Sequence, residues 1–350
     1  MKKNYNDNAL DLFRIVATIQ VFLGHFIAHF TLPGNLSGSV PLYNGIYFLR
    51  GVPILFALCG FLAAKSLDRY SAKEYLIRRG FRILPGFWAC ILTNTAIIFI
   101  LYGLPSVRDG AIYFVTQLLG LNFYTGDWLR DYGVGTPNGV LWTIGVQIQF
   151  FILAPILHKI LKKLKLSGSM ILVGVLAVLS IAIEKCSGFM PDTLYKMIRV
   201  TVVPYLYFLI LGMAAWVFRN QLIAVLERLR WAILPVFVLW KMAENNWQFP
   251  HIFDGVLYNT ITTLLTAMLI FAFAFRFKFR MKKDLTYGFY LYHMVFINIA
   301  VHCGHKRLGI NWQSALVTVA VTVLPILVAW LSQNFIEDPA AKLYKKKEGV

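Results

Sequence analysis

The chain alternates between long apolar segments and short connections that are rich in polar and charged residues. A helix needs about 20 residues to cross a hydrocarbon core about 30 Å thick, and ten segments approach this length. The ten predicted spans cover residues 9–31, 43–66, 86–104, 139–160, 169–186, 199–218, 231–243, 255–276, 285–303 and 312–335. The pattern therefore predicts an all-α protein, a polytopic bundle of about ten transmembrane helices that forms one domain over residues 1–350.

Composition supports a membrane protein and excludes an ordinary soluble domain. Hydrophobic residues make up 58% of the chain and charged residues only 14%, whereas soluble domains are about one quarter charged. Lys2 and Lys3 precede the first apolar segment, as in a signal peptide. That segment is too long for a signal sequence and lacks a small-residue cleavage pattern, so we expect a retained helix.

The positive charges predict how the chain is oriented in the membrane. The net charge of +18 is concentrated in connections between apolar segments, which favours the positive-inside pattern over nucleic-acid binding. Every second connection is rich in positive charge, and together these connections hold 24 Lys and Arg residues. They are the N-terminus, residues 65–82, 159–165, 219–230 and 276–283, and the tail from Lys342. The connections between them hold only about eight. We therefore expect both termini in the cytoplasm and the largest outer loop, suited to meeting a sugar, at 105–138.

The first predicted span contains four polar side chains: Asp11, Arg14, His25 and His29. Charged and polar groups inside a span are costly, so each is a candidate for function. Eleven residues separate Arg14 from His25, which places them on one helix face about 16 Å apart along the axis. A long anionic donor would then have its phosphates at Arg14 and its reactive end at His25. The alternative is that Arg14 reaches toward lipid headgroups and that His25 only packs.

Two further groups of polar residues are candidates. Arg79 and Arg82 share a face of a helix, and their planar guanidinium groups match phosphate geometry. The alternative is a charge cluster that contacts anionic lipid. Gln147 and Gln149 lie inside the fourth span but cannot share one face, so we expect one of them to have an interhelical partner.

The remaining polar and sulfur-containing residues point to packing. For most of Tyr287, Tyr290, Tyr292 and His293 in the ninth span, aromatic packing is the expected role. His302 and His305 lack a carboxylate at ligand spacing, and the four cysteines have no CxxC spacing, so no metal site is predicted and the cysteines are expected to be core residues.

In this order, the motifs resemble bacterial integral-membrane acyltransferase family three over nearly the whole chain. The first span is similar to the family's "LDGLR…H" and keeps ten residues between Arg14 and His25. Residues 56–61 (FALCGF) resemble "FFxxSGF" with Cys59 in the serine position, and residues 79–85 match R-x-x-R-I-x-P. The run 142–155 matches "WSLSxExQFYxxxP" with Gln147 in place of Glu, 286–293 looks like "SYGIYLWH", and 335–339 looks like "xxEKP".

The resemblance implies an O-acyltransferase of the standalone type in the bacterial cytoplasmic membrane. It would move an acyl group, with acetyl as the expected one, from acetyl coenzyme A or another acyl coenzyme A to a hydroxyl of an extracytoplasmic saccharide or glycolipid. His25 would be the catalytic histidine, either as a base or as a covalent carrier. Donor binding is expected at Arg14, Arg79 and Arg82, with supporting residues Asp11, Gln147, Tyr287, His293 and Glu337. Because glutamine cannot ionise, Gln147 cannot act as an orienting carboxylate.

A transporter or flippase for a lipid-linked saccharide is the alternative function. In that case the same polar stripe would line a translocation path. Such proteins often show inverted repeats or helices broken by Gly and Pro in corresponding positions, and the sequence shows no such pairs. The partners expected for the enzyme are acyl coenzyme A, a glycan acceptor and membrane lipid, and no nucleic acid or bound cofactor.

Overall fold

The structure is a computed structural model that describes residues 5, 8–32, 40–122, 124–246 and 255–347. Lys2 and Lys3, on which the predicted N-terminal orientation partly rests, lie outside these ranges. Helices form 79% of the described chain, and the one β-type pairing in it is a bridge between Thr31 and Arg307. The prediction of an all-α polytopic protein is confirmed.

Two compact units divide the chain, and each is made of several sequence segments. Unit 1 comprises residues 1–20, 47–75 and 146–282, and unit 2 comprises residues 21–46, 76–145 and 283–350. The first helix, α1 (Leu10–His29), contributes its first half to unit 1 and its second half to unit 2.

Unit 1 is built around two closely packed helices, α3 (Gly51–Leu67) and α9 (Leu206–Val217). A Cβ atom at Gly60 would lie 2.0 Å from the carbonyl oxygen of Leu209, and one at Gly212 would lie 2.0 Å from that of Ala57. Both positions therefore require glycine, because small residues allow helix backbones to approach closely. The other helices of unit 1 are α6 (Trp142–Lys163), α7 (Leu166–Lys185), α8 (Asp192–Arg199), α10 (Leu222–Asn246) and α11 (Gly255–Phe273).

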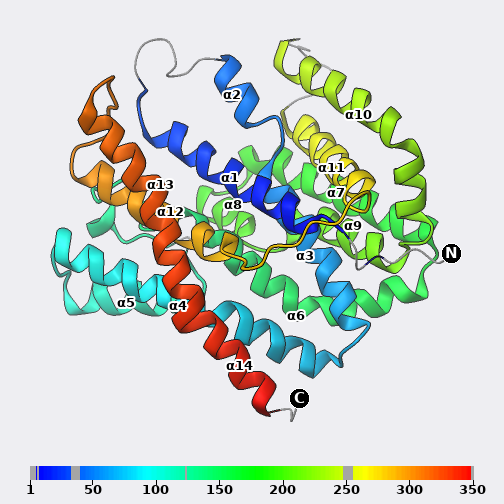
Figure 1. Cartoon of the computed structure of the whole chain (residues 1–350), viewed down its shortest axis with the longest axis horizontal. Helices are drawn as coiled ribbons and strands as arrows, with labels where there is room; N and C mark the ends of the chain where they lie inside the picture. Colours follow the sequence, from blue (N-terminus) through cyan, green and yellow to red (C-terminus); the bar gives the residue numbers. More distant parts are fainter. Residues whose placement is uncertain (1–4, 6–7, 33–39, 123, 247–254, 348–350) are drawn as a thin grey trace. The chain divides into compact units, whose positions relative to one another are not determined.

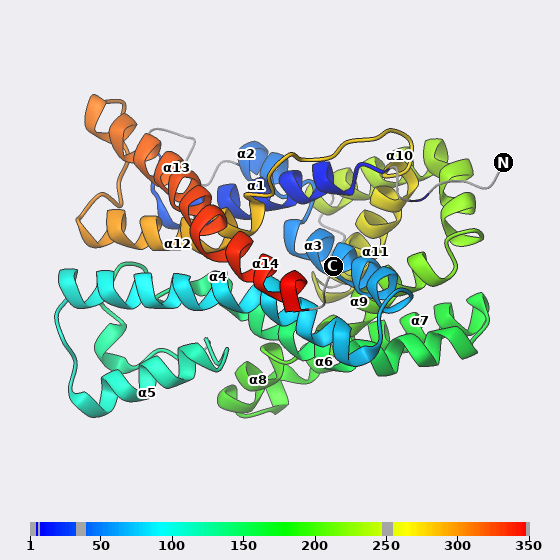
Figure 2. The same ribbon diagram turned by 60° about the horizontal axis from the view of Figure 1, so that its bottom comes forward.

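In unit 2, α12 (Thr286–His302) packs along α13 (Trp312–Ser332) in both ribbon views (Figures 1 and 2). A Cβ atom at Gly288 would lie 2.9 Å from the Cβ atom of Ala329, which shows how close the two helices are. A π-helical turn over Gln333–Glu337 joins α13 to α14 (Asp338–Lys347), so that the three follow one another as a rod (Figure 2). The unit also contains α2 (Val40–Ile46), α4 (Ala72–Leu101) and α5 (Val107–Leu118).

Each predicted span overlaps a helix, but the bounds differ and the count of ten is not confirmed. The predicted span 43–66, for example, covers α2 and α3 with a non-helical stretch between them. Among the described residues, six helical segments are long and apolar enough to cross a membrane. A seventh results if α8 and the following segment up to Val217, which bend by 51°, form one broken span. The predicted seventh span lies in α10, which is 25 residues long but carries charges such as Glu227, Arg228 and Lys241.

The segment 105–138, expected to be the largest outer loop, contains the helix α5 and contributes to a small hydrophobic core. Ser106 caps α5, because its side chain accepts a hydrogen bond from the Asp109 backbone N–H. Behind α5, four buried residues pack together: Ile98, Tyr113, Leu129 and Tyr132. The expectation that the cysteines are core residues is right for Cys90, which is buried, and wrong for Cys186 and Cys303, which are exposed, while Cys59 is partly exposed.

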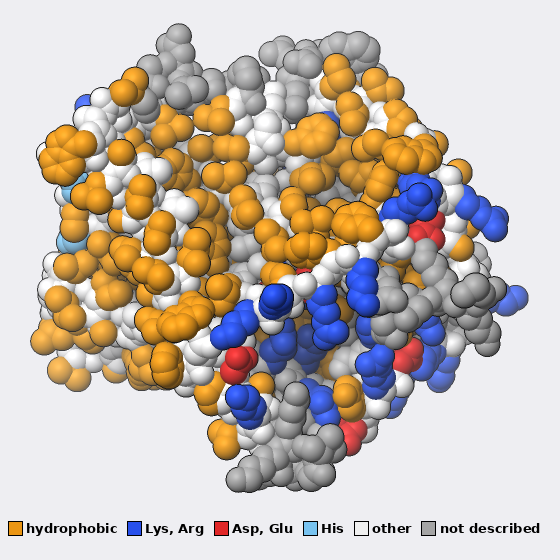
Figure 3. Space-filling view, viewed as in Figure 1, with side chains coloured by type: hydrophobic (Ala, Val, Ile, Leu, Met, Phe, Trp, Pro, Cys, Tyr) orange, Lys and Arg blue, Asp and Glu red, His pale blue; other side chains and the backbone are white. Residues whose placement is uncertain are grey.

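Apolar side chains cover much of the surface drawn in Figure 3. Exposed large hydrophobic residues occur on many of the spans, for example Ile100 on α4 and Ile171 on α7. In water such a surface would be unfavourable, whereas lipid tails solvate it. The structure is therefore that of a multi-pass membrane protein.

Candidate functional site

Arg14 and His25 lie on one unbroken helix, α1, as the sequence predicts. They are eleven residues apart, so the rise of the helix places them about 16 Å apart along its axis and nearly on one face. Arg14 belongs to unit 1, whereas His25 and His29 belong to unit 2.

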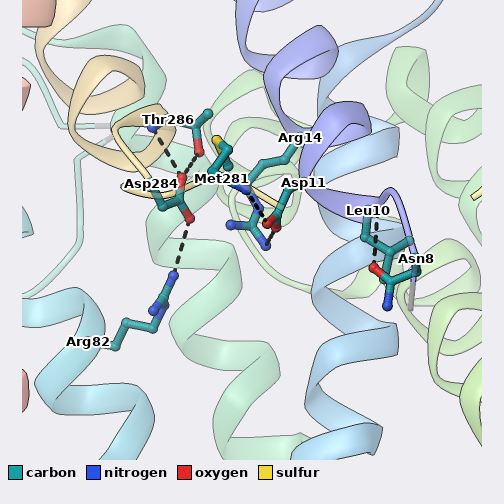
Figure 4. A network of polar contacts seen from close by, with 8 residues as sticks. All are labelled: Asn8, Leu10, Asp11, Arg14, Arg82, Met281, Asp284 and Thr286. Carbon is teal, nitrogen blue, oxygen red and sulfur yellow. Dashed lines mark hydrogen bonds and ion pairs between the residues drawn. The ribbon is translucent and has the colours of Figure 1, made fainter. Parts of the chain in front are cut away.

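At its first turn, α1 is fixed by a small polar group in unit 1 (Figure 4). One carboxylate oxygen of Asp11 lies 3.5 Å from the Arg14 guanidinium, and the other accepts a hydrogen bond from the Met281 backbone N–H at 3.2 Å. Just before the helix, the Ala9 N–H donates to the Ala274 carbonyl at 2.7 Å. Asp11 therefore connects Arg14 to the segment that follows α11, and its supporting role in the reaction stays a prediction.

The arginine pair lies on α4 in unit 2, and the helix confirms that Arg79 and Arg82 share a face. The Arg82 guanidinium is largely exposed, and it lies 3.3 Å from the Asp284 carboxylate (Figure 4). Asp284 in turn accepts hydrogen bonds from the backbone N–H and the hydroxyl of Thr286, at the start of α12. The ion pair thus connects the arginine motif to α12 while leaving much of the guanidinium accessible.

A cluster of three imidazoles forms in unit 2 from α1 and α12. The rings of His25 and His293 have centroids 5.5 Å apart with a tilt of 43°, and His25 stacks on His29 at 5.8 Å. His293 is completely buried, and its Nδ1 lies 3.2 Å from the Phe289 carbonyl oxygen. The structure therefore brings the predicted catalytic histidine into contact with one of its predicted supporting residues.

Tyr287 and Glu337, two other expected supporting residues, help to hold unit 2 together. The Tyr287 hydroxyl donates to the Ile83 carbonyl on α4 at 2.8 Å, and Glu337 accepts from the Ser332 hydroxyl at 2.8 Å. A Cβ atom at Gly86 would lie 3.1 Å from both Tyr287 and Glu337, so all three meet at one point on α4. These contacts position α12 and the end of α13 against the helix that carries the arginine pair.

Of the two glutamines of α6, Gln149 has partners outside its own helix, as the face argument predicts, whereas a place for Gln147 in a site stays a prediction. Gln149 has interhelical partners, because it donates to the Val200 carbonyl and accepts from the Val202 backbone N–H, both at 3.0 Å. Gln147 is half-buried and belongs to unit 1.

Three buried asparagines were missed by the sequence reasoning. Asn298 on α12 accepts from the Val134 backbone N–H at 2.9 Å and donates to the carbonyls of Thr136 and Pro137. Asn94 on α4 also donates to the Pro137 carbonyl, and Asn138 donates to the Leu291 carbonyl. Together they fasten the segment 133–138 to two helices of unit 2. Asn94 and Asn298 lie inside predicted spans, so the cost of intramembrane polar groups was a signal that could have found them.

His302, at the end of α12, packs against two tyrosine rings. The His302 ring lies 5.0 Å from that of Tyr132 and 5.7 Å from that of Tyr102. Across the described ranges, no three His, Cys, Asp or Glu side chains are grouped so that they could hold a metal ion.

Residues 7–333 match the sequence profile of the acyltransferase domain family. The chain belongs to acyltransferase family three. The resemblance stated from the order of the motifs is thereby confirmed, and this family three protein is an integral-membrane acyltransferase.

Two relatives of this family three acyltransferase align over most of its length. It is 26% identical over 360 residues to nodulation protein 10 of Rhizobium leguminosarum bv. viciae, covering 96% of this chain and 94% of that protein. It is 24% identical over 329 residues to peptidoglycan O-acetyltransferase OatA of Listeria monocytogenes, covering 83% of this chain and 51% of OatA. No solved structure matches the chain.

Proposed function

We propose that this acyltransferase moves an acyl group, with acetyl as the expected one, from acyl coenzyme A at the cytoplasmic face to a hydroxyl of a saccharide or glycolipid outside. The observation that carries the proposal is His25, a half-buried imidazole on a membrane-spanning helix that also carries Arg14 on nearly the same face. The name of the relative OatA, an O-acetyltransferase acting on peptidoglycan, supports an acetyl group and a glycan acceptor.

In the proposed reaction, one ring nitrogen of His25 removes the proton from the acceptor hydroxyl. The hydroxyl oxygen attacks the thioester carbonyl, the carbon–sulfur bond breaks, and the coenzyme A thiolate leaves and takes up the proton from His25. A covalent acyl-imidazole on His25 is the alternative route, in which the acyl group is transferred twice. In either route the imidazole returns to its neutral state.

Arg79 and Arg82 are proposed to hold the donor phosphates. Their planar guanidinium groups donate paired hydrogen bonds that match phosphate oxygens, and the exposed Arg82 is accessible from solvent. This contribution is one of positioning, because the arginines take no part in bond making. That Arg14 joins them in donor binding stays a prediction.

The decisive experiment uses purified protein in detergent or nanodiscs with radiolabelled acetyl coenzyme A. We expect saturable binding of coenzyme A, slow hydrolysis of the thioester, and faster release of coenzyme A when a suitable glycan is added. Mass spectrometry of surface glycans from cells with and without the gene would show the acceptor through a gained acyl mass. Failure to bind or cleave any acyl coenzyme A, combined with movement of a lipid-linked saccharide across vesicles, would instead support a flippase.

A further inference from the structure

Of the two ring nitrogens of His293, Nδ1 has a hydrogen-bond partner and Nε2 has none among the described residues. Its Nδ1 lies 3.2 Å from the Phe289 carbonyl oxygen, and because a carbonyl oxygen can only accept, Nδ1 carries the hydrogen in the neutral ring. Its Nε2 is then a bare acceptor. In the part of the chain that the structure describes, this buried Nε2 has no hydrogen-bond partner. Buried polar atoms normally have one, so the nitrogen is expected to receive a donor in the working enzyme.

Among the aromatic side chains that contact the His293 ring, His25 is the suitable donor. Phe22 and Phe289 pack against the His293 ring but offer no side-chain hydrogen-bond donor. Tyr290 also packs there, but its hydroxyl already shares a hydrogen bond with Thr143 at 2.9 Å. His25 lies with its centroid 5.5 Å away, a separation at which two facing ring nitrogens come within hydrogen-bond distance of about 3 Å.

We propose that His293 is a positioning residue for His25, accepting the hydrogen of one His25 ring nitrogen at its own Nε2. The inference rests on the proposed function, in which the other His25 nitrogen removes the acceptor's proton. A base imidazole needs its second nitrogen held in the correct tautomer and orientation, a task that a carboxylate performs in many enzymes. When His25 takes the proton it becomes positively charged, and the hydrogen bond to Nε2 strengthens while the proton stays on His25.

At the position where the resembled motif has Glu, this chain has Gln147. Gln147 cannot ionise, and it belongs to the other unit. His293 offers a neutral acceptor on a rigid, fully buried helix position, with its tautomer fixed by a backbone carbonyl. The pair His25 and His293 thus supplies both a base and its orienting partner from two helices of one unit.

Two substitutions separate a positioning role from a packing role. His293→Gln keeps a side-chain acceptor near the place of Nε2 but loses the donor to Phe289. His293→Asn keeps an amide donor near the place of Nδ1 but has nothing where Nε2 was. The proposal predicts that kcat falls about a hundredfold in His293→Asn and no more than about tenfold in His293→Gln, with the KM for acyl coenzyme A unchanged in both. A purely structural role predicts the reverse order, because only the asparagine preserves the bond to the helix backbone.

Combining His293→Asn with His25→Ala in one protein gives a test that does not depend on the size of either single effect. If His293 acts through His25, His293→Asn will have no further effect on the residual rate of His25→Ala. Should His293→Asn fail to fold, His293→Phe provides the second variant, because it keeps an aromatic ring in the pocket and removes both nitrogens. The proposal then predicts the same hundredfold loss in kcat for the phenylalanine variant.

The outcomes distinguish this inference from the proposed function. Suppose that His25→Ala is inactive while His293→Asn, or a folded His293→Phe variant, keeps a near-normal kcat. This result would overturn the role of His293 and leave the catalytic role of His25 intact. An active His25→Ala would overturn both. Equal losses in the glutamine and asparagine variants, or additive losses in the double variant, would also contradict positioning through Nε2.

Discussion

His25 and His29 lie one turn apart on α1 and form a matched pair for testing catalysis. We expect His25→Ala to insert, fold and bind coenzyme A, while acyl transfer by the purified protein falls at least about a hundredfold, the typical contribution of a positioned base. His29→Ala is the control and should retain most of the transfer rate. Near-normal transfer in His25→Ala with loss of transfer in His29→Ala would assign the base to His29 instead.

The donor arginines are tested by binding rather than by turnover. Hydrogen bonds to charged groups contribute roughly 1.5–3 kcal/mol each, so Arg82→Ala should weaken coenzyme A binding by about ten- to a hundredfold in calorimetry. Arg82→Lys should recover only part of the affinity, because an ammonium group lacks the planar pair of donors.

A matched control for Arg82 is available elsewhere in unit 2. Arg130 has a similar exposed side-chain fraction, 66% against 63%, and is also paired to an aspartate. Arg130→Ala should leave coenzyme A affinity unchanged. Unchanged affinity in a folded double variant, Arg79→Ala with Arg82→Ala, would assign these two arginines to lipid contact.

At the scale of helices, a carboxylate at the end of α3 connects three helices of unit 1. Asp68 accepts hydrogen bonds from the Trp216 indole N–H at 2.8 Å and from His158 at 3.1 Å, and its other close partner is the Lys162 ammonium at 2.5 Å. Burial by itself would raise the pKa of Asp68, but the hydrogen bonds from Lys162 and Trp216 and the nearby positive charges lower the pKa below its usual value.

This lowered pKa predicts a pH-dependent stability. A carboxyl group whose pKa is lower in the folded state stabilises the fold above its unfolded pKa of about 3.9, and this contribution disappears as the pH falls further. Asp68→Asn should therefore lower the free energy of unfolding in detergent at pH 7 by about 1–3 kcal/mol, and the melting temperature should fall accordingly. The difference from the unchanged protein should shrink as the pH falls below about 4 and through the lowered pKa of Asp68.

Asp127 provides the control for Asp68. Its side chain is 93% exposed and forms a surface ion pair with Arg130, which is worth little. Asp127→Asn should leave the melting temperature nearly unchanged at every pH. A difference between Asp68→Asn and the unchanged protein that stays constant from pH 7 to pH 3 would contradict the role of the Asp68 charge.

For the whole molecule, the predicted orientation can be measured by cysteine labelling. Leu104 and Ser167 are exposed. Leu104 is the last residue of the third predicted span, at its predicted outer end, and Ser167 lies in a predicted inner connection. Leu104 is preferable to the neighbouring Ser106, which caps α5. The exposed Cys186 and Cys303 should first be changed to serine to remove background labelling.

With both termini in the cytoplasm, a membrane-impermeant maleimide applied to whole cells should label Leu104→Cys and leave Ser167→Cys unlabelled. Permeabilisation should then expose the second site. The charge asymmetry between alternate connections is the physical reason for this expectation. Labelling of Ser167→Cys alone before permeabilisation would reverse the orientation, and equal labelling of both would contradict an odd number of spans between them.

The amino-acid sequence alone determined the class of the protein, the family, and the approximate places of the apolar helices, each of which overlaps a predicted span. Transfer of apolar side chains into lipid depends on local composition and is nearly additive, so it can be evaluated without knowing the fold. The spacing from Arg14 to His25 and that from Arg79 to Arg82 were also predictable, because each pair lies within one helix whose geometry is fixed.

Only the tertiary structure decided which helices meet and which polar groups they share. The contact of His25 with His293, the close approach of Gly60 to Leu209, and the attachment of the segment 133–138 by Asn298 each join residues more than a hundred positions apart. A hydropathy pattern says that Asn298 is costly in a membrane but not what satisfies it. Its partners are backbone groups of a connection, and these have no side-chain signature in the sequence, so the pairing arises only when the helices pack together.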